Sequence, residues 1–238
     1  MQATSAPTGF RNVIGIPITE IIDKKHNIWI GISFGNKQFT IDNILKLTET
    51  ALTFTKDQVL IFLPGRLHAI NLQSFEGLSE ERAIEQVKIE ETKKQEQIED
   101  ALQIFSTDQR SRIVLATYDD VLSPEFDRRL QTLCEEFDHN NDFKDDIHNV
   151  VRELLASRGR TVNEERLTLL SNFVLGELPL FLDGLTIKGA PERFTVLLYP
   201  GLGFIDELVS EIKVGSRYKD LRQKLGSGLL TGVVDISF

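Results

Sequence analysis

The chain has 238 residues, 41% of them hydrophobic, and a formal net charge of −9 at pH 7. A chain of this length can bury a core without disulfides or metal ions. Its acidic balance argues against a general nucleic-acid coat protein, because contacts to phosphate need clustered Lys and Arg. The single cysteine, Cys134, excludes an intramolecular disulfide, and no pair of histidines has the spacing of a zinc helix. We therefore expect neither a disulfide within the chain nor a cysteine-based metal cluster.

The first residues, MQATSAPTGFRN, lack the basic start and apolar stretch of a signal peptide. The longest apolar runs, such as residues 59–64, are too short to span a bilayer. We therefore expect a cytoplasmic protein without membrane contact, in which residues 1–11 form a flexible lead and residues 12–238 a single domain.

Short runs rich in branched apolar residues alternate with longer helical patterns. The predicted strands are 12–16, 28–33, 56–64, 112–117 and 193–200. The predicted helices are 41–54, 80–105, 124–137, 143–155 and 162–181. This alternation predicts an α/β fold with a mostly parallel sheet that helices cover on both faces. Reactive groups of such sheets lie beyond the carboxyl ends of strands, where Ser33 and Tyr199 fall.

The stretch GISFG, residues 31–35, fits the G-x-S-x-G pattern of a hydrolase nucleophile. A hydrolase serine also needs an acid and then a histidine late in the chain. The last histidine here is His148, and Ser33 follows only one or two strands. The pattern therefore leaves two interpretations open, a nucleophile or a hydroxyl that caps a loop or helix.

Glu177 lies on an apolar face of the predicted helix 162–181. The residues at helical spacing from it are Leu170, Phe173, Val174 and Phe181. A desolvated carboxylate needs a cationic partner or takes up a proton. One interpretation is a glutamate at a fraying helix end beside Pro179, and the other is a pocket carboxylate that binds a cation such as an amino group.

Five segments in order resemble motifs of the cyclodipeptide synthases, which make diketopiperazines from two aminoacyl-tRNAs. The segments are GISFGN (31–36), LPGRLHAINLQSFEG (63–77), ATYDDVL (116–122), FVLGELPLFLDG (173–184) and LLYPG (197–201). The resemblance implies a monomeric Rossmann-like catalytic domain, similar to that of tyrosyl- and tryptophanyl-tRNA synthetases. It implies two aminoacyl-tRNA substrates and, since these are activated esters, no need for ATP or a metal.

The resemblance also implies roles for three residues. Ser33 would be the nucleophile that carries the first aminoacyl group as an ester. Glu177 would bind the α-amino group of that moiety and assist proton transfers. Tyr199 would position the substrate and help the final cyclisation.

Further residues are expected to contact substrate. Gly31 and Trp29 share the strand face of Ser33, so Gly31 would leave room for the acyl group and Trp29 would shape a side-chain pocket or simply pack in the core. Residues at other strand ends are expected as apolar pocket walls: Ile61, Leu63, Leu115 and Leu198. The basic segment 213–224 is expected to contact tRNA through Lys213, Arg217, Lys219, Arg222 and Lys224. Basic residues at a helix end also complement its dipole without any RNA.

Three features depart from the family pattern. Phe173 replaces a tyrosine four residues before the glutamate, so a hydroxyl expected near the amino group is absent. Asn36 occurs together with Tyr199-Pro200, a mixed signature that favours the family's Tyr-Pro subgroup. The segment 80–100 is acidic overall, whereas family members often carry a strongly basic helix for the first tRNA. We expect Asn36 and Phe173 to remain among the substrate-binding residues.

Two other functions stay open. A serine hydrolase would require a histidine within reach of Ser33. A Rossmann-like module that binds aminoacyl-tRNA or a nucleotide without chemistry would not form an ester on Ser33.

Overall fold

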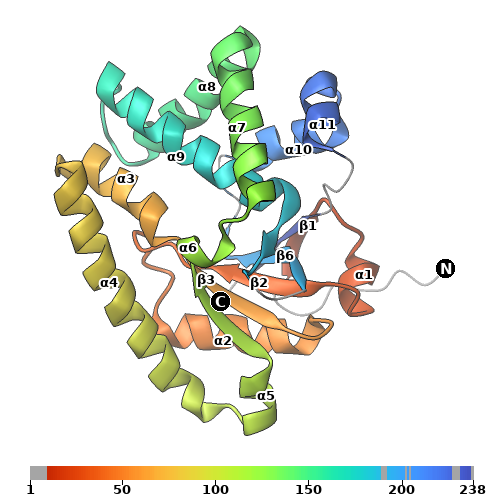
Figure 1. Ribbon diagram of the computed structural model, residues 1–238. Coiled ribbons are helices and arrows are strands. Elements are labelled where there is room, and N and C mark those ends of the chain that lie inside the picture. The colour runs from red at the N-terminus through yellow and green to blue at the C-terminus, as the bar shows by residue number, and fades with distance from the viewer. Residues whose placement is uncertain (1–9, 189–191, 202, 204, 227–230, 237–238) are drawn as a thin grey trace.

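The structure, a computed structural model, describes residues 10–188, 192–201, 203, 205–226 and 231–236. A twisted sheet forms its centre (Figure 1). The strands are β1 (Phe10–Ile14), β2 (Asn27–Gly31), β3 (Val59–Leu63), β4 (Ile113–Thr117), β5 (Leu185–Thr186), β6 (Arg193–Tyr199) and β7 (Gly232–Ile236). The order is β1-β7-β6-β2-β3-β4, and the short β5 pairs with β6. Only the pairs β1–β7 and β5–β6 are antiparallel, so the predicted, mostly parallel sheet is confirmed.

The strand order places a topological switch between β2 and β6. From β2 the chain passes to β3 on one side, whereas β6 and β7 lie on the other. Helices that leave the two strands cover opposite faces, which opens a crevice at their carboxyl ends. Ser33 follows β2 and Tyr199 ends β6, so both residues lie beside this crevice.

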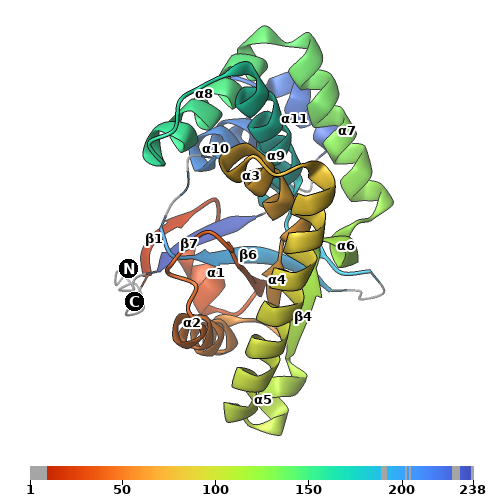
Figure 2. The same ribbon diagram turned by 90° about the vertical axis from the view of Figure 1, so that its left-hand side faces the viewer.

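One face of the sheet is covered by α1 (Ile18–Ile22) and α2 (Ile41–Phe54), which lies below the sheet in Figures 1 and 2. The hydroxyl of Thr40 accepts a hydrogen bond from the backbone of Asn43 and so begins α2. The apolar stripe of α2 includes Ile44 and Leu47, which pack against strand residues such as Ile30 and Ile61.

The opposite face carries most of the helices. These are α3 (Gly65–Glu76), α6 (Tyr118–Val121), α7 (Pro124–His139), α8 (Asn141–Ser157), α9 (Glu164–Asp183), α10 (Asp206–Val214) and α11 (Lys219–Leu225). Helices α7 to α11 share a core of their own, with Leu133, Ile147 and Leu178 fully buried. Helix α9 continues through Pro179 to Asp183 and connects this layer to the sheet.

A long helix, α4 (Glu80–Ala101), runs along one side of the molecule (Figure 2). Ala83 and Val87 pack on α3, and Ile98 joins the core below the sheet, so the helix lies against the body at both ends. It leads through the short helix η1 (Leu102–Ile104) and α5 (Thr107–Ser111) to β4. Within the described residues, no helix is long and apolar enough to cross a bilayer.

The structure differs from the predicted elements at both ends of the chain. Phe10 and Arg11, which we expected in the flexible lead, belong to β1, because Phe10 is buried against Phe54; residues 1–9 of that lead lie outside the described residues. The sequence analysis also missed two strands, β5 and β7, and six helices, α1, α3, α5, α6, α10 and α11.

Candidate active site

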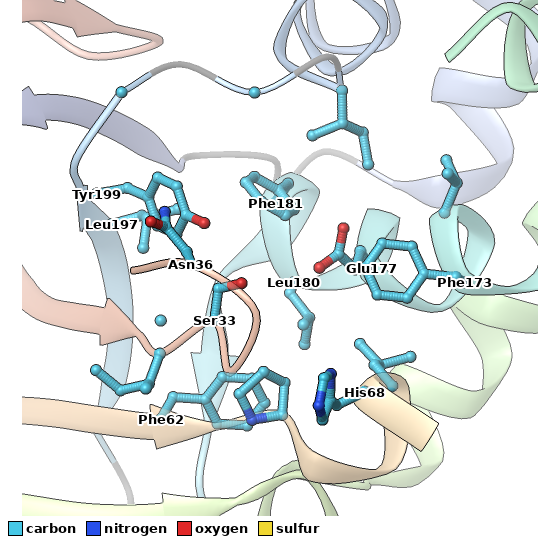
Figure 3. A pocket seen from close by; sticks show the side chains of 18 of the residues that line it. Ser33, Asn36, Phe62, His68, Phe173, Glu177, Leu180, Phe181, Leu197 and Tyr199 are labelled. Atoms are coloured by element: carbon cyan, nitrogen blue, oxygen red, sulfur yellow. The ribbon is translucent and has the colours of Figure 1, made fainter. Parts of the chain in front are cut away.

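A cavity of about 340 Å³ lies at the carboxyl ends of β2 and β6, beside α9 (Figure 3). This volume is in the range of small-molecule sites. Ser33, Asn36, Glu177 and Tyr199 all line it, although they come from distant parts of the chain. The apolar part of the lining includes Trp29, Phe62, Leu67, Phe173, Leu180, Phe181, Leu197 and Val233.

Ser33 lies two residues beyond the end of β2. The backbone N–H of Ile32 still donates to Phe62 of β3 at 2.9 Å, so the chain keeps its strand direction up to the serine. The carbonyl of Ser33 then accepts from the N–H of Asn36 at 3.2 Å, which closes a turn. This turn holds the half-buried Ser33 hydroxyl at the cavity wall (Figure 3).

Tyr199 is the last residue of β6, next to Ser33 (Figure 3). Ile30 of β2 pairs with Leu198, so Gly31 and Tyr199 are the next residues on the two strands. Burial raises the pKa of the Tyr199 phenol, and polar interactions with the side chains of Asn36 and Ser33 partly offset that rise. The phenol therefore stays protonated at neutral pH and is available to donate a hydrogen bond.

Glu177 projects from α9 into the cavity, beside Phe173 and opposite Ser33 (Figure 3). Among the described residues, no hydrogen-bond donor or basic side chain pairs with its carboxylate. Burial, with a smaller contribution from the charge of Asp206, raises the pKa of Glu177 to about 8. This raised pKa favours the protonated carboxyl group near neutral pH, and a bound cation would favour its ionised form.

Close packing between α3 and α9 fixes the position of Glu177. A Cβ on Gly176 would lie 2.7 Å from Cδ2 of Leu67 in α3, so any larger residue here would require the Leu67 side chain to move. The hydroxyl of Tyr118 donates to the carbonyl of Gly176 at 3.3 Å and ties α9 to α6. The predicted apolar surroundings of Glu177 are confirmed for Phe173, Val174 and Phe181, which line the same cavity.

Trp29 and Gly31 both lie in the cavity wall, on the face that the alternation along β2 predicts. Trp29 is only 3% exposed and packs edge-on against Phe62 and Phe181, so it is part of the core as well as of the wall. A Cβ on Gly31 would lie 3.1 Å from Cζ3 of Trp29. The absence of a side chain at Gly31 therefore keeps space open next to the serine.

The predicted pocket walls Leu63, Leu115 and Leu198 are wrong, as is Ile61. All four pack in the core on the α2 side of the sheet. Successive side chains of a strand point to opposite faces, and these residues are one position out of phase with the cavity. Phe62 and Leu197, their neighbours in the sequence, line the cavity instead.

His68 of α3 also lines the cavity, a placement that the sequence reading missed. Its ring stacks on Phe34 with 5.1 Å between centroids, and its Nε2 lies 3.4 Å from Glu90. Burial lowers the pKa of His68. No hydrogen bond joins Ser33 to His68 in the described part of the chain, so the paired serine and histidine of a hydrolase are not assembled here.

Asp206 and Lys213 form a second, half-buried charged group beside the cavity. Asp206 lines the cavity and accepts a hydrogen bond from the N–H of Gly203 at 2.5 Å. Burial lowers the pKa of Lys213 to about 8, and its ammonium donates to the carbonyl of Thr231. Lys213 is half-buried and its ammonium is already bonded to Thr231, so the structure gives no support to its predicted contact with tRNA, which stays a prediction.

The other basic residues of segment 213–224 lie on the surface, but most are engaged. Arg217 pairs with Asp146 at 2.5 Å, and Lys224 pairs with Glu136 at 3.0 Å. Arg222 donates to the carbonyl of Val214 at 3.0 Å, at the end of α10. Lys219 is exposed and has no ion-pair partner among the described residues.

The described residues contain no group of three His, Cys, Asp or Glu side chains placed to hold a metal ion. The polar groups that converge in the cavity are instead a hydroxyl, a phenol, an amide and a carboxyl group, from Ser33, Tyr199, Asn36 and Glu177. Such a set suits acyl transfer with a serine nucleophile and a carboxyl group for an amine.

Comparison with solved structures shows the same fold in cyclodipeptide synthases. The enzyme from Bacillus thermoamylovorans superimposes with a TM-score of 0.71 at 22% identity, over 92% of this chain and 91% of that one. A Mycobacterium tuberculosis protein, described as showing that cyclodipeptide synthetases are related to type I tRNA synthetases, gives 0.71 at 18% identity, over 100% and 99%. The cyclodipeptide synthase of Candidatus Glomeribacter gigasporarum, bound to Phe-tRNAPhe, gives 0.57 at 16% identity, over 89% and 87%.

No curated protein sequence matches this chain. The family model described as cyclodipeptide synthase matches residues 17–223, which include Ser33, Glu177 and Tyr199. The chain therefore belongs to the cyclodipeptide synthase family.

Proposed function

We propose that this protein joins the aminoacyl groups of two aminoacyl-tRNAs into a cyclic dipeptide, through esters carried on Ser33. The single observation that supports this most is the meeting of Ser33, Glu177 and Tyr199 in one cavity, from β2, α9 and β6. Membership of the cyclodipeptide synthase family supports the same reaction.

In the first step, Oγ of Ser33 attacks the ester carbonyl of the first aminoacyl-tRNA. The bond from the carbonyl carbon to the ribose oxygen breaks, and the serine proton passes to that oxygen. The reaction exchanges one ester for another, so it needs no external energy source. An apolar wall with a few polar groups keeps water away from the ester that forms on Ser33.

In the second step, the amine of the second aminoacyl-tRNA attacks the seryl ester. This forms the first peptide bond, releases the Ser33 hydroxyl and leaves a dipeptide on the second tRNA. Ser33 takes over the dipeptidyl group by the same ester exchange. The free amine of the dipeptide then attacks its own ester carbonyl, which closes the ring, forms the second peptide bond and returns the proton to Ser33.

Glu177 is the group that binds the amine and moves its proton. An α-amino group has an ordinary pKa of about 7.7–8.0, and the pKa of Glu177 is about 8. Because these values match, a proton shared by the two groups moves at little free-energy cost. The amine thus binds as an ammonium ion and is released as the neutral nucleophile.

Tyr199 positions the reacting ester and assists ring closure through its phenol. The side chains of Asn36 and Ser33 both interact with the Tyr199 phenol, which supports a place for Asn36 among the substrate-binding residues. Asn36 together with Tyr199-Pro200 remains a mixed signature that favours the Tyr-Pro subgroup. The enzyme would act as a monomer in the cytoplasm, where charged tRNAs are available.

The proposal is tested by incubating the protein with a mixture of charged tRNAs and analysing diketopiperazines by mass spectrometry. The wild-type protein should yield at least one cyclic dipeptide and an aminoacyl ester on Ser33. Ser33→Ala should remove both, with a rate loss on the order of a millionfold, as for other serine nucleophiles. Ser111→Ala, at an exposed serine of α5, is the matched control. Absence of product from every amino-acid mixture would overturn the proposal.

One observation favours a second candidate, a serine hydrolase, since His68 lines the same cavity as Ser33. His68→Gln separates the two functions. A synthase keeps its aminoacyl-enzyme in this variant, whereas a hydrolase loses the general base and with it all ester formation on Ser33. A non-catalytic binding module would give no ester on Ser33 even in the wild type.

A further inference from the structure

Arg158 lies at the mouth of the cavity, at the residue that follows α8. It lines the same cavity as Ser33, yet it is exposed to solvent. Its guanidinium group lies over the ring of Phe75, 4.6 Å from the centroid. This stacking limits the side chain to one position and leaves the edges of the guanidinium free to donate hydrogen bonds.

No acidic side chain neutralises Arg158 in the part of the chain that the structure describes. Arg217, in contrast, pairs with Asp146, and Arg129 pairs with Asp183. A positive charge without a partner, fixed at the entrance of a cavity, favours an anionic ligand there.

The guanidinium also lies close to the loop that carries the nucleophile. A Cβ on Gly35 would lie 3.7 Å from one terminal nitrogen of Arg158 and 3.8 Å from the other. Gly35 is two residues beyond Ser33. Burial raises the pKa of Tyr199 and lowers that of His68, and the positive charge of Arg158 makes a small lowering contribution to both pKa values.

The proposed substrate has opposite charges at its two ends. Its ammonium group belongs inside the cavity, at Glu177, and the nearest anion in an aminoacyl-tRNA is the phosphodiester beside the aminoacylated ribose. A planar guanidinium matches two phosphate oxygens at once. With Glu177 inside and Arg158 at the mouth, the two charges of the substrate would orient its ester across Ser33.

We propose that Arg158 binds the phosphodiester next to the terminal ribose of the aminoacyl-tRNA and so aligns the ester with Ser33. This rests on the proposed function. Arg158 is a positioning residue for the ester, and it contacts a part of the substrate that takes no part in bond formation. Binding energy from such a remote group contributes to rate by orienting the reacting atoms.

The test removes the phosphate and the guanidinium separately. Two short donors are compared, 3′-O-aminoacyl adenosine 5′-phosphate and the same ester without the phosphate. The measured quantity is kcat/KM for formation of the aminoacyl ester on Ser33. The variants are Arg158→Gln, Arg158→Lys and the control Arg152→Gln, which changes another exposed arginine of α8, bonded to Asn149.

The wild type should prefer the phosphorylated donor by about 10- to 100-fold, the range for one charged hydrogen-bonded contact. Arg158→Gln should abolish this preference, so that the rate falls far more with the phosphorylated donor than with the unphosphorylated one. Arg158→Lys should restore part of it, since lysine keeps the charge without the planar fork. Equal losses with both donors, or no loss with either, would overturn the inference.

The salt dependence of binding to uncharged tRNA tests the role of Arg158 independently of catalysis. Arg158→Gln should make the salt dependence of tRNA binding shallower by about 0.7 in log–log slope, the contribution of one phosphate contact on a single strand. The Arg152→Gln control should keep the wild-type slope. If the wild type forms no ester from any donor, the proposed function fails, whereas an unchanged slope in Arg158→Gln overturns only the role of Arg158.

Discussion

The phenol of Tyr199, at the end of β6, interacts directly with the side chain of Ser33, just beyond the end of the neighbouring strand β2. The contact crosses the switch point of the sheet, and the two residues are separated in the sequence by most of the fold. Because burial raises the pKa of this phenol, it stays protonated, and in the proposed reaction it would donate a hydrogen bond to the ester on Ser33.

Tyr199→Phe removes the hydroxyl and keeps the ring that packs against Phe39, with 5.4 Å between ring centroids. The fold should therefore persist. We expect the aminoacyl ester on Ser33 to form and cyclic product to decrease by about 100- to 1000-fold, the range for the loss of one donor to a developing oxyanion. Mass spectrometry of the intact protein should show dipeptidyl-enzyme accumulating. Loss of the aminoacyl ester itself would instead assign Tyr199 to the first step.

Glu177→Gln should impair turnover far more than Phe173→Leu, although both residues line the cavity side by side. Glutamine keeps the shape of the side chain but neither binds an ammonium ion as a carboxylate nor moves a proton. We expect a fall in kcat of at least about 100-fold, as for loss of a general base, and a change of only a few-fold for Phe173→Leu. The reverse ranking in steady-state assays would make the carboxyl group structural.

The raised pKa of Glu177 also predicts how stability depends on pH. The pKa changes from an ordinary 4.5 to about 8 in the folded protein. Between these values the folded protein binds more protons than the unfolded chain, so the free energy of unfolding falls as pH rises from about 4.5 to 8. Glu177→Gln removes this contribution. The variant should match the wild type near pH 5 in urea melts and exceed it by pH 8.

The shifted pKa of Lys213 changes the free energy of unfolding in the opposite direction, and at higher pH. Its pKa falls from an ordinary 10.5 to about 8 in the folded protein. Between these values the unfolded chain binds more protons, so this group makes the free energy of unfolding rise with pH. Below pH 8 Lys213 therefore contributes little, and the difference between the urea melts of wild type and Glu177→Gln from pH 5 to 8 reports on Glu177. A constant difference between wild type and Glu177→Gln over that range would contradict the assignment of its pKa.

Gly31→Ala should change which first amino acid is accepted. The added methyl group would lie 3.1 Å from Trp29 and 3.7 Å from Leu197, both of which are buried. The methyl group therefore occupies space beside Ser33. We expect large side chains to lose about 10- to 200-fold in competition with small ones, the usual discrimination for one carbon. The measurement is the mass of the aminoacyl-enzyme formed from mixed charged tRNAs. An equal loss for all sizes would mean that Gly31 only supports the strand.

Much of this site could be predicted from the sequence, because its central groups stand out from their surroundings. Ser33 follows an apolar strand, and Glu177 interrupts an apolar helix face, which is costly unless the carboxyl group is used. The pocket walls at Leu63, Leu115 and Leu198 were assigned wrongly because they were chosen for their position at strand ends. Their side chains point to the face of the sheet opposite to that of Ser33. Alternation with period two would have selected Phe62 and Leu197.

Other features depend on contacts that no local pattern contains. Strand β7 consists of five fully or nearly buried residues at the end of the chain, and only its partners β1 and β6 define it as a strand. Arg158 looks like any basic residue after a helix until Phe75 and Gly35 are seen next to it. The sequence likewise showed segment 213–224 as basic, whereas the acids that pair with Arg217 and Lys224 come from α8 and α7.

These ion pairs sharpen the test of tRNA contact at segment 213–224. Reversing the charge of Arg217 would break its ion pair with Asp146, and reversing that of Lys224 would break its ion pair with Glu136. A loss of tRNA binding in such a variant could then result from a less stable protein. Lys219 is exposed without such a partner among the described residues, so Lys219→Glu changes surface charge alone. If this surface contacts tRNA, the variant should raise KM for charged tRNA severalfold, and less so at high salt. Lys46→Glu, an exposed lysine of α2 on the other side of the sheet, is the control. An identical KM for both variants and the wild type at low salt would place the tRNA elsewhere on the protein.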